Sequence, residues 1–163
     1  MSKTEIIAEP GTSTIVMRRT FDAPRELVHR AYADPELLKQ WMGPARLKMR
    51  IDEYEPRHGG RYRFVHFDAD GTEYAFRGVF HGDQGVDGGM MRTFEWEGLP
   101  GHVSFETASF IEADGRTTVE STSVFMAVED RDGMIANGMQ TGVDEGYDKL
   151  DELLAKELTG APA

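Results

Sequence analysis

The sequence predicts an α+β domain in which a curved, seven-stranded antiparallel sheet wraps around a long C-terminal helix, with two short helices between the first two strands. Three observations predict this class. Apolar and polar residues alternate with period two over most of residues 47–126, turn-forming clusters interrupt that pattern at regular intervals, and a helical period begins after Asp130. A chain of 163 residues suits one domain that buries roughly two thirds of its unfolded surface.

The N-terminal segment, residues 1–12, contains Pro10 followed by Gly11. We expect it to form a flexible lead-in or a short edge element. Residues 14–20 are rich in β-branched side chains and are predicted to form the first strand.

Two helix-start signals follow this strand. Asp22 and Asp34 each precede a proline within two residues, and an acidic N-cap with an early proline is typical of a helix start. We expect one short helix to end near residue 33 and a second to end before Gly43.

The remainder of the chain divides into a strand region and a helix. Turn clusters lie at residues 58–60, 68–71, 82–89, 98–101 and 113–115, which implies six further strands in a meander. Apolar residues then recur at spacings of three or four: Ile135, Met139, Val143, Tyr147, Leu150 and Leu154. This pattern predicts a helix that runs to about Leu158, so the single domain spans residues 13–158 and residues 159–163 form a frayed tail.

Charge and composition exclude several classes of partner and chemistry. The net charge of −11 repels phosphate backbones and anionic membranes, so we expect no nucleic-acid or membrane partner. The absence of cysteine excludes disulfides, thiolate catalysis and sulfur-ligated zinc. Neither an export signal nor an apolar run of membrane-spanning length is apparent, and a cytoplasmic location is expected.

Reflecting each hairpin about its turn cluster brings aromatic residues together on one face of the sheet. One cross-strand row contains Phe64, Phe76, Phe94 and Phe105, and the next contains His66, Tyr74, Trp96 and Val103. The alternate positions are mostly charged or polar, as on the solvated side of an antiparallel sheet. The inward face is therefore predicted to be strongly aromatic.

Glycines at every fourth position of the C-terminal helix face these rings. Gly138, Gly142 and Gly146 would share one helix face, although each interior glycine costs about 1 kcal/mol relative to alanine. Either another backbone approaches closely there, or space is left open. The first alternative gives an ordinary packed core, and the second gives a ligand cavity whose helical wall includes Met139, Val143 and Tyr147.

A third inward row holds the only clear charge on that face. It contains Tyr62, Gly78, Arg92 and Thr107, and no counter-ion for Arg92 is apparent within the row. The guanidinium can anchor a carboxylate or phenolate of a ligand beside Tyr62 and over a gap at Gly78. Alternatively, it lies near a strand end and extends into water.

The sequence gives little support for catalysis. Its five histidines form no close ligand pair, so no metal and no other cofactor are expected. His66 can be a general base, a hydrogen-bonding partner of a ligand, or a core residue. The glycines of residues 82–89 lie between strands rather than before a helix, and no G-x-S-x-G motif occurs, so we assign no catalytic residue.

Several motifs carry a resemblance to a known family. They are Thr20-Phe21-Asp22-Ala23-Pro24, Gln40-Trp41-Met42-Gly43-Pro44, Gly59-Gly60-Arg61-Tyr62, Phe76-Arg77-Gly78-Val79-Phe80, Thr93-Phe94-Glu95-Trp96 and Tyr147-Asp148-Lys149-Leu150. Over about residues 13–156 the chain resembles the helix-grip fold of the SRPBCC superfamily, which includes birch-pollen-allergen, START and polyketide-cyclase proteins. Within it, the motifs are similar to the group named for the C-terminal domain of the heat-shock-protein-90 ATPase activator.

The resemblance implies a cavity between sheet and helix that binds a small apolar or amphipathic molecule. The candidate ligand-binding residues are Trp41, Tyr62, Phe64, His66, Tyr74, Phe76, Arg92, Phe94, Trp96, Phe105, Met139, Val143 and Tyr147. Two alternatives stay open: a cofactor-independent enzyme of the cyclase and aromatase type that uses His66, Tyr62 or Arg92, and a chaperone co-factor or protein-interaction module. A homodimer is compatible with all three.

Overall fold

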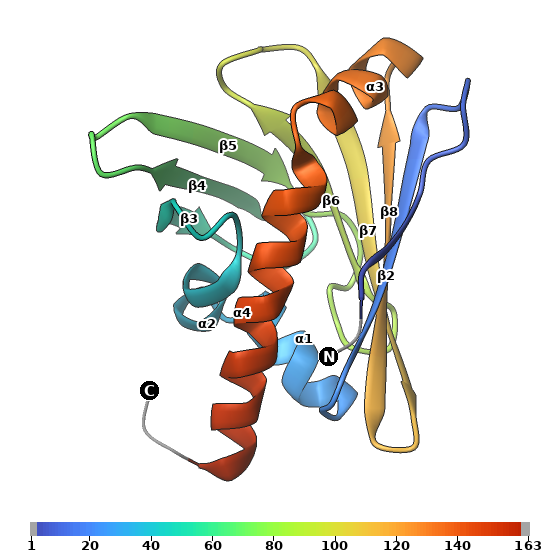
Figure 1. Ribbon diagram of the computed structural model, residues 1–163, viewed down its shortest axis with the longest axis vertical. Coiled ribbons are helices and arrows are strands. Elements are labelled where there is room, and N and C mark those ends of the chain that lie inside the picture. The colour runs from blue at the N-terminus through green and yellow to red at the C-terminus, as the bar shows by residue number, and fades with distance from the viewer. Residues whose placement is uncertain (1–2, 161–163) are drawn as a thin grey trace.

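The computed structural model describes residues 3–160, which form eight strands and four helices (Figure 1). The strands are β1 (Glu5–Ile7), β2 (Thr14–Phe21), β3 (Lys48–Tyr54), β4 (Arg61–Phe67), β5 (Glu73–Val79), β6 (Met90–Trp96), β7 (Val103–Ala113) and β8 (Arg116–Phe125). The helices are α1 (Arg25–Ala33), α2 (Pro35–Trp41), α3 (Val128–Ala136) and α4 (Met139–Thr159). None of the described helices is long and apolar enough to cross a membrane.

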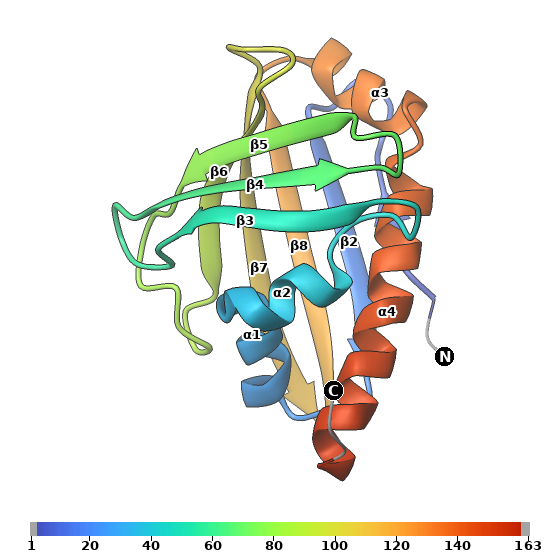
Figure 2. The same ribbon diagram turned by 90° about the vertical axis from the view of Figure 1, so that its left-hand side faces the viewer.

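All eight strands form one antiparallel sheet in the order β1-β2-β8-β7-β6-β5-β4-β3. The sheet twists so strongly that β3, β4 and β5 run across the direction of β2, β7 and β8 (Figure 2). The long helix α4 stands along the hollow side of this sheet, and α1 and α2 close one end of the hollow (Figures 1 and 2). An α+β domain with a curved antiparallel sheet and a long C-terminal helix is thus confirmed.

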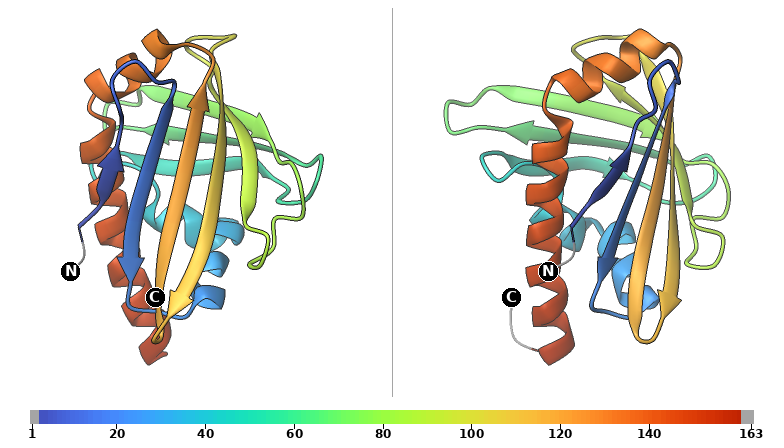
Figure 3. Two further views of the ribbon diagram at one scale, coloured as in Figure 1. Left: turned by 90° about the vertical axis from the view of Figure 1, so that its right-hand side faces the viewer. Right: turned by 45° about the vertical axis from the view of Figure 1, so that its right-hand side comes forward.

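The sheet has eight strands rather than the predicted seven, because Glu5–Ile7 pairs with β2 at the edge (Figure 3). Of the two expectations for residues 1–12, the short edge element describes this part of the segment. Buried Arg131 of α3 holds the next stretch, donating to the Glu9 carbonyl at 2.7 Å and to Thr12 Oγ1 at 3.1 Å. A stretch of three residues shows too little alternation of apolar and polar side chains to predict a strand. Its pairing with β2 is visible only in the tertiary structure.

The predicted N-cap is found for α2 but not for α1. Asp34 caps α2 as expected, and its carboxylate accepts from the Glu36 backbone N–H at 2.9 Å. For α1 the N-cap residue is Pro24, without a side-chain cap, and Asp22 instead pairs with Arg116 at 2.7 Å. An ion pair across the strand ends has replaced the expected cap.

The predicted C-terminal helix is interrupted. It consists of α3 and α4, separated by Asn137 and Gly138, and Gly138 has a left-handed φ of +80°. Such a backbone favours glycine and ends the helical hydrogen bonding, so Gly138 does not lie on the α4 face as predicted. The tail expected over residues 159–163 lies outside the described residues apart from Thr159, the last residue of α4, and Gly160.

Buried aromatic rings pack together where α1 and α2 meet α4. Trp41 stacks on Tyr147 with ring centroids 6.1 Å apart, and its indole N–H donates to the Ala31 carbonyl at 2.9 Å. Phe21 meets the edge of Tyr147 at 5.4 Å. The backbone of α4 comes closer to α1, α2 and α3 than to the central strands.

Candidate ligand-binding site

Aromatic side chains line the concave face of the sheet along β4, β5 and β6. The predicted β4–β5 register is confirmed, with Phe64 opposite Phe76 and His66 opposite Tyr74. Phe64 and Phe76 stack with centroids 5.4 Å apart, and Phe76 stacks on Phe94 at 5.2 Å. The β5–β6 register differs by two residues from the one predicted by reflection about the turn, and Phe76 lies opposite Trp96. A shift of two residues keeps the same side chains on the concave face.

On strand β7, the side chains predicted to lie on the concave side of the sheet lie on its convex side. Phe105 pairs with Thr93, is 37% exposed and lies on the convex side, while Ser104 opposite Phe94 is buried. The assignment of Phe105 to the ligand site was therefore wrong. The loop between the paired residues Glu95 and Val103 contains an odd number of residues, whereas reflection about the cluster 98–101 assumed an even number.

The one-residue shift brings Glu106, not Thr107, to the concave face beside Arg92. Arg92 Nε donates to Glu106 Oε1 at 3.0 Å, and Ser123 Oγ lies 3.5 Å from the other carboxylate oxygen. The counter-ion that was absent from the predicted row thus exists. Arg92 does not extend away from the sheet, since its guanidinium carbon lies 4.7 Å from the centre of the Tyr62 ring.

Gly78 is not a gap beside this pair. A Cβ at this position would lie 2.0 Å from the Thr93 carbonyl oxygen and 2.7 Å from the Tyr62 ring. The Tyr62 hydroxyl donates to that carbonyl at 2.6 Å, and Thr93 Oγ1 accepts from the Val79 N–H at 2.9 Å. These side-chain bonds satisfy backbone groups where the β5–β6 ladder is interrupted, so Gly78 allows the Tyr62 ring to cross β5.

The protonation states of Arg92 and of the tyrosines beside it do not change near neutral pH. Burial lowers the pKa of Arg92, but Tyr62 and Glu106 more than offset it, so the guanidinium stays a cation. Burial raises the pKa of Tyr62 and raises that of Tyr54 to about 12. The nearby phenols are therefore neutral.

His66 lies at the other end of the aromatic row and is only 7% exposed. Its ring meets the edges of Phe64 at 5.2 Å and Phe76 at 5.7 Å. Nδ1 has no hydrogen-bond partner within residues 3–160. Burial, together with the positive charge of Lys149, lowers the pKa of His66 to about 4, so the imidazole is neutral at physiological pH.

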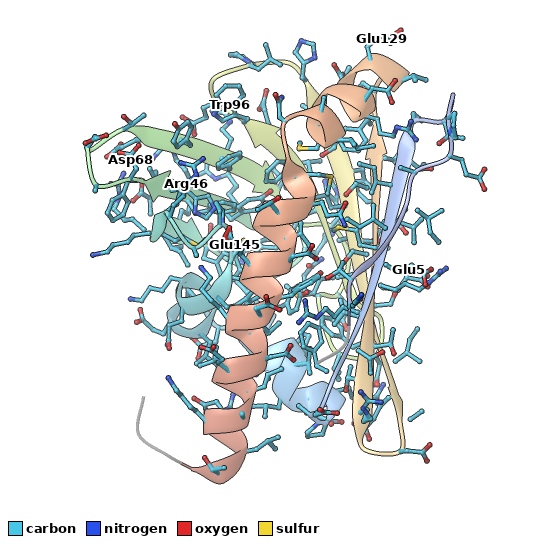
Figure 4. The ribbon with its side chains drawn as sticks, in the orientation of Figure 1. Glu5, Arg46, Asp68, Trp96, Glu129 and Glu145 are labelled. Carbon is cyan, nitrogen blue, oxygen red and sulfur yellow. The ribbon has the colours of Figure 1, made fainter. Side chains whose placement is uncertain are left out.

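The thirteen predicted site residues fall into groups with different surroundings. Trp41, Tyr62, Phe64, His66 and Tyr147 are buried, whereas Tyr74, Phe76, Arg92, Phe94, Met139 and Val143 are half-buried. Trp96 is 41% exposed and lies opposite Phe76 of β5, in the upper part of the view in Figure 4. Trp41 and Tyr147 therefore belong to the packed core, whereas the half-buried set lies on β5, β6 and the N-terminal half of α4.

Close backbone packing explains Gly146 of α4 but not Gly142. A Cβ on Gly146 would lie 3.1 Å from the Trp41 carbonyl oxygen and 3.2 Å from the Gly43 nitrogen. A Cβ on Gly142 would lie 3.6 Å from Pro44. Of the two readings of the glycine spacing, the close backbone approach is found at Gly146 alone, and the glycines give no support for a cavity.

A recess of about 630 Å³ lies elsewhere, along the edge strand β3 and below α2. Met49, Ile51, Tyr54 and Phe67 contribute apolar walls. Its charged residues are paired with one another, Lys39 with Glu36 at 2.7 Å and Arg50 with Glu73 at 3.2 Å. The stacked rings Phe64, Phe76 and Phe94 do not line this recess, so it is separate from the site predicted on the concave face.

Sequence reasoning missed Glu106 and Ser123, the polar side chains nearest Arg92. An odd number of loop residues between β6 and β7 would have placed Glu106 opposite Arg92. That number is known only once the pairing of the two strands is known. Within residues 3–160, no three His, Asp or Glu side chains come together in a way that could hold a metal ion.

Comparison with known proteins gives the family. Residues 22–155 match the family described as Activator of Hsp90 ATPase homolog 1-like protein. No curated protein matches the chain closely enough to count as a relative.

Solved structures with low sequence identity share the fold. A crystal structure from Rhodobacter sphaeroides is 24% identical with a TM-score of 0.86, covering 94% of this chain and 99% of that one. An NMR structure from Arthrobacter aurescens is 22% identical with a TM-score of 0.84, covering 93% and 91%. A crystal structure of the AHSA1 protein from Silicibacter pomeroyi is 19% identical with a TM-score of 0.71, covering 88% and 99%. With the family match, these show that the chain belongs to the Activator of Hsp90 ATPase homolog 1-like family of the SRPBCC superfamily.

Proposed function

We propose that the protein binds a small apolar or amphipathic molecule between the concave face of β4–β7 and the N-terminal half of α4. The single observation that carries this proposal is that Phe76 and Phe94 stay half-buried on the concave face. Met139 and Val143 of α4 are half-buried too. Covering such surface stabilises a complex by about 25 cal/mol per Å² of apolar area removed from water.

Membership of the SRPBCC superfamily supports the same proposal, since proteins with this fold commonly bind hydrophobic ligands. Fold alone does not transfer function, so the half-buried rings and not the family carry the assignment. The site residues proposed are Tyr62, Phe64, His66, Tyr74, Phe76, Arg92, Phe94, Trp96, Met139 and Val143.

The test combines native mass spectrometry with a binding assay. Freshly purified protein is examined for a co-purifying small molecule, and a library of apolar compounds is screened by thermal shift. Phe94→Arg should abolish the shift while circular dichroism shows a folded protein. Phe105→Arg is the matched control, because the same change lies on the convex face and should leave binding intact.

A second route blocks the site from the helix. Val143→Trp adds volume on α4 and should weaken binding without introducing a charge. If no compound in the library binds, or if Phe94→Arg and Phe105→Arg bind equally well, the proposal is wrong.

A second candidate function, protein interaction, is favoured by a different observation. Phe105 and Val124 pair across β7 and β8 on the convex face, and they are 37% and 41% exposed. Met91, on the neighbouring strand, is 38% exposed. Sedimentation and a pull-down with purified Hsp90 test this candidate: Phe105→Arg should abolish any association, and a monomer that binds no Hsp90 would count against it.

A further inference from the structure

The ion pair on the concave face leaves part of its guanidinium available. Arg92 Nε donates to Glu106, and within residues 3–160 this is the only hydrogen bond that the Arg92 side chain makes. The two terminal nitrogens of the guanidinium have no protein acceptor there. The side chains of Arg92 and Glu106 are 19% and 27% exposed, although both start from central strands on the hollow side of the sheet. A guanidinium with free donors in a partly enclosed position is able to receive a ligand.

The neighbouring side chains hold this guanidinium in a defined orientation. Its carbon lies 4.7 Å from the centre of the Tyr62 ring and 5.7 Å from that of Phe94. Tyr62 is itself held by its hydrogen bond to the Thr93 carbonyl. Glu106 occupies the Nε side. The terminal nitrogens, with their parallel N–H donors, are therefore the part of the group that remains open.

Apolar surface lies directly beside these donors. Phe94 contacts the guanidinium on one side and stacks on Phe76 on the other, and both rings are half-buried. A molecule that placed a polar head on Arg92 would thus lay its body along Phe94 and Phe76. This arrangement matches an amphipathic ligand with its polar group at one end.

We propose that the ligand carries a carboxylate head group, which accepts two hydrogen bonds from the terminal nitrogens of Arg92, and an apolar body that lies on Phe94 and Phe76. This inference rests on the proposed function and names the class of ligand. A carboxylate has two acceptor oxygens at the spacing of the guanidinium fork and no donor, so its shape and charge both fit. An amide offers only one acceptor oxygen.

Glu106 explains how the site stays stable without ligand. An unpaired buried cation is strongly destabilising, and Glu106 supplies the counter-charge when the site is empty. A ligand carboxylate at the terminal nitrogens is nearer to the guanidinium than to Glu106, which is bound at the opposite side. The net charge of −11 gives no general attraction for anions, so any preference for acids must come from Arg92.

The experiment compares acids with neutral molecules of similar shape by isothermal titration calorimetry. The probes are naphthylacetic acid with naphthylacetamide, and dodecanoic acid with dodecanol. We expect each acid to bind at least about tenfold more tightly than its neutral partner, as a charge-assisted hydrogen bond pair implies. Arg92→Gln should remove that preference, so that the acid and its neutral partner bind this variant with equal affinity.

Two further variants separate charge from geometry. Arg92→Lys keeps the charge but not the fork and should retain only part of the preference. Glu106→Gln keeps an acceptor for Nε but removes the like charge, and it should tighten binding of the acids several-fold relative to the neutral probes. Both remain informative if Arg92→Gln fails to fold.

The outcomes separate this inference from the proposed function. If acid and neutral partner bind equally to the wild-type protein, the carboxylate proposal is overturned and the proposed binding function stands. If neither member of either pair binds, and the apolar library also gives no shift, the proposed function fails and the carboxylate proposal fails with it.

Discussion

Gly146 of α4 lies against the backbone of Gly43, in the turn between α2 and β3: a Cβ on Gly146 would lie 3.2 Å from the Gly43 nitrogen and 3.3 Å from its oxygen. The two glycines let a helix and a loop far apart in sequence approach without side chains between them.

Two alanine variants should therefore have opposite effects on stability. Gly142→Ala meets only Pro44, at 3.6 Å, and should stabilise the protein by about 0.5–1 kcal/mol through helix propensity. Gly146→Ala gains the same propensity but must displace backbone atoms of residues 41–43, and it should destabilise by about 1 kcal/mol or more. Urea unfolding of both variants checks this, and a gain in stability for Gly146→Ala would contradict the close contact.

His66 should make stability depend on pH. Its pKa is lowered to about 4 by burial and by Lys149, against 6.5 for the ordinary group, so the unfolded chain binds a proton more readily than the folded one. Stability contributed by the neutral imidazole is then present above about pH 6.5 and lost as the pH falls towards 4, by up to about 3 kcal/mol.

The measurement is the difference in unfolding free energy between the wild-type protein and His66→Gln at several pH values. Other titrating groups cancel in this difference. The stability of the wild type relative to His66→Gln should fall as the pH is lowered from 6.5 to 4 and stay level above pH 7. A pH-independent difference would show that the pKa of His66 is the same in the folded and unfolded protein.

Arg19 connects β2 to α4 and should contribute strongly to stability. Its side chain is 2% exposed and donates to Asp148 at 2.8 Å and to Asp151 at 2.6 Å. Arg19→Met should cost about 2–4 kcal/mol, because Asp151, only 21% exposed, would be left without its partner.

Asp148→Asn provides the matched comparison. Asp148 is 52% exposed and water screens its charge, so its loss should cost less than about 1 kcal/mol. Both values come from chemical denaturation, and equal losses in the two variants would show that burial does not determine the strength of the pair.

Arg131 should hold the N-terminal strand in place. It is 4% exposed and donates to the Glu9 carbonyl and to Thr12 Oγ1, so Arg131→Met removes the hydrogen bonds that join α3 to this segment. We expect a loss of about 1–3 kcal/mol and faster hydrogen exchange in residues 5–12, with β7 and β8 unchanged. Asp132→Asn is the control, since Asp132 is 57% exposed and contacts only the outer side of the guanidinium. Unchanged exchange in Arg131→Met would contradict this role.

Local patterns determined much of the fold. The alternation in residues 61–79 predicted both strands β4 and β5 and their pairing, because the hairpin is nearly symmetric about its turn and a slip would have exposed the aromatic rows. The acid and proline before residue 36 predicted the start of α2, since capping depends only on neighbouring residues. The motifs of residues 20–44, 59–62, 76–80, 93–96 and 147–150 were enough to indicate the family that the comparison confirmed.

The tertiary structure decided what depends on distant parts of the chain. The face of β7, and with it the exposure of Phe105 and the pairing of Glu106 with Arg92, follows from an odd loop that simple reflection could not anticipate. Gly146 is needed because the backbone of Gly43 packs against it in the folded protein. Glu5–Ile7 forms an edge strand because it pairs with β2. Composition and periodicity specify which elements form because they act within a few residues, whereas register and close contacts arise only when segments far apart in sequence meet.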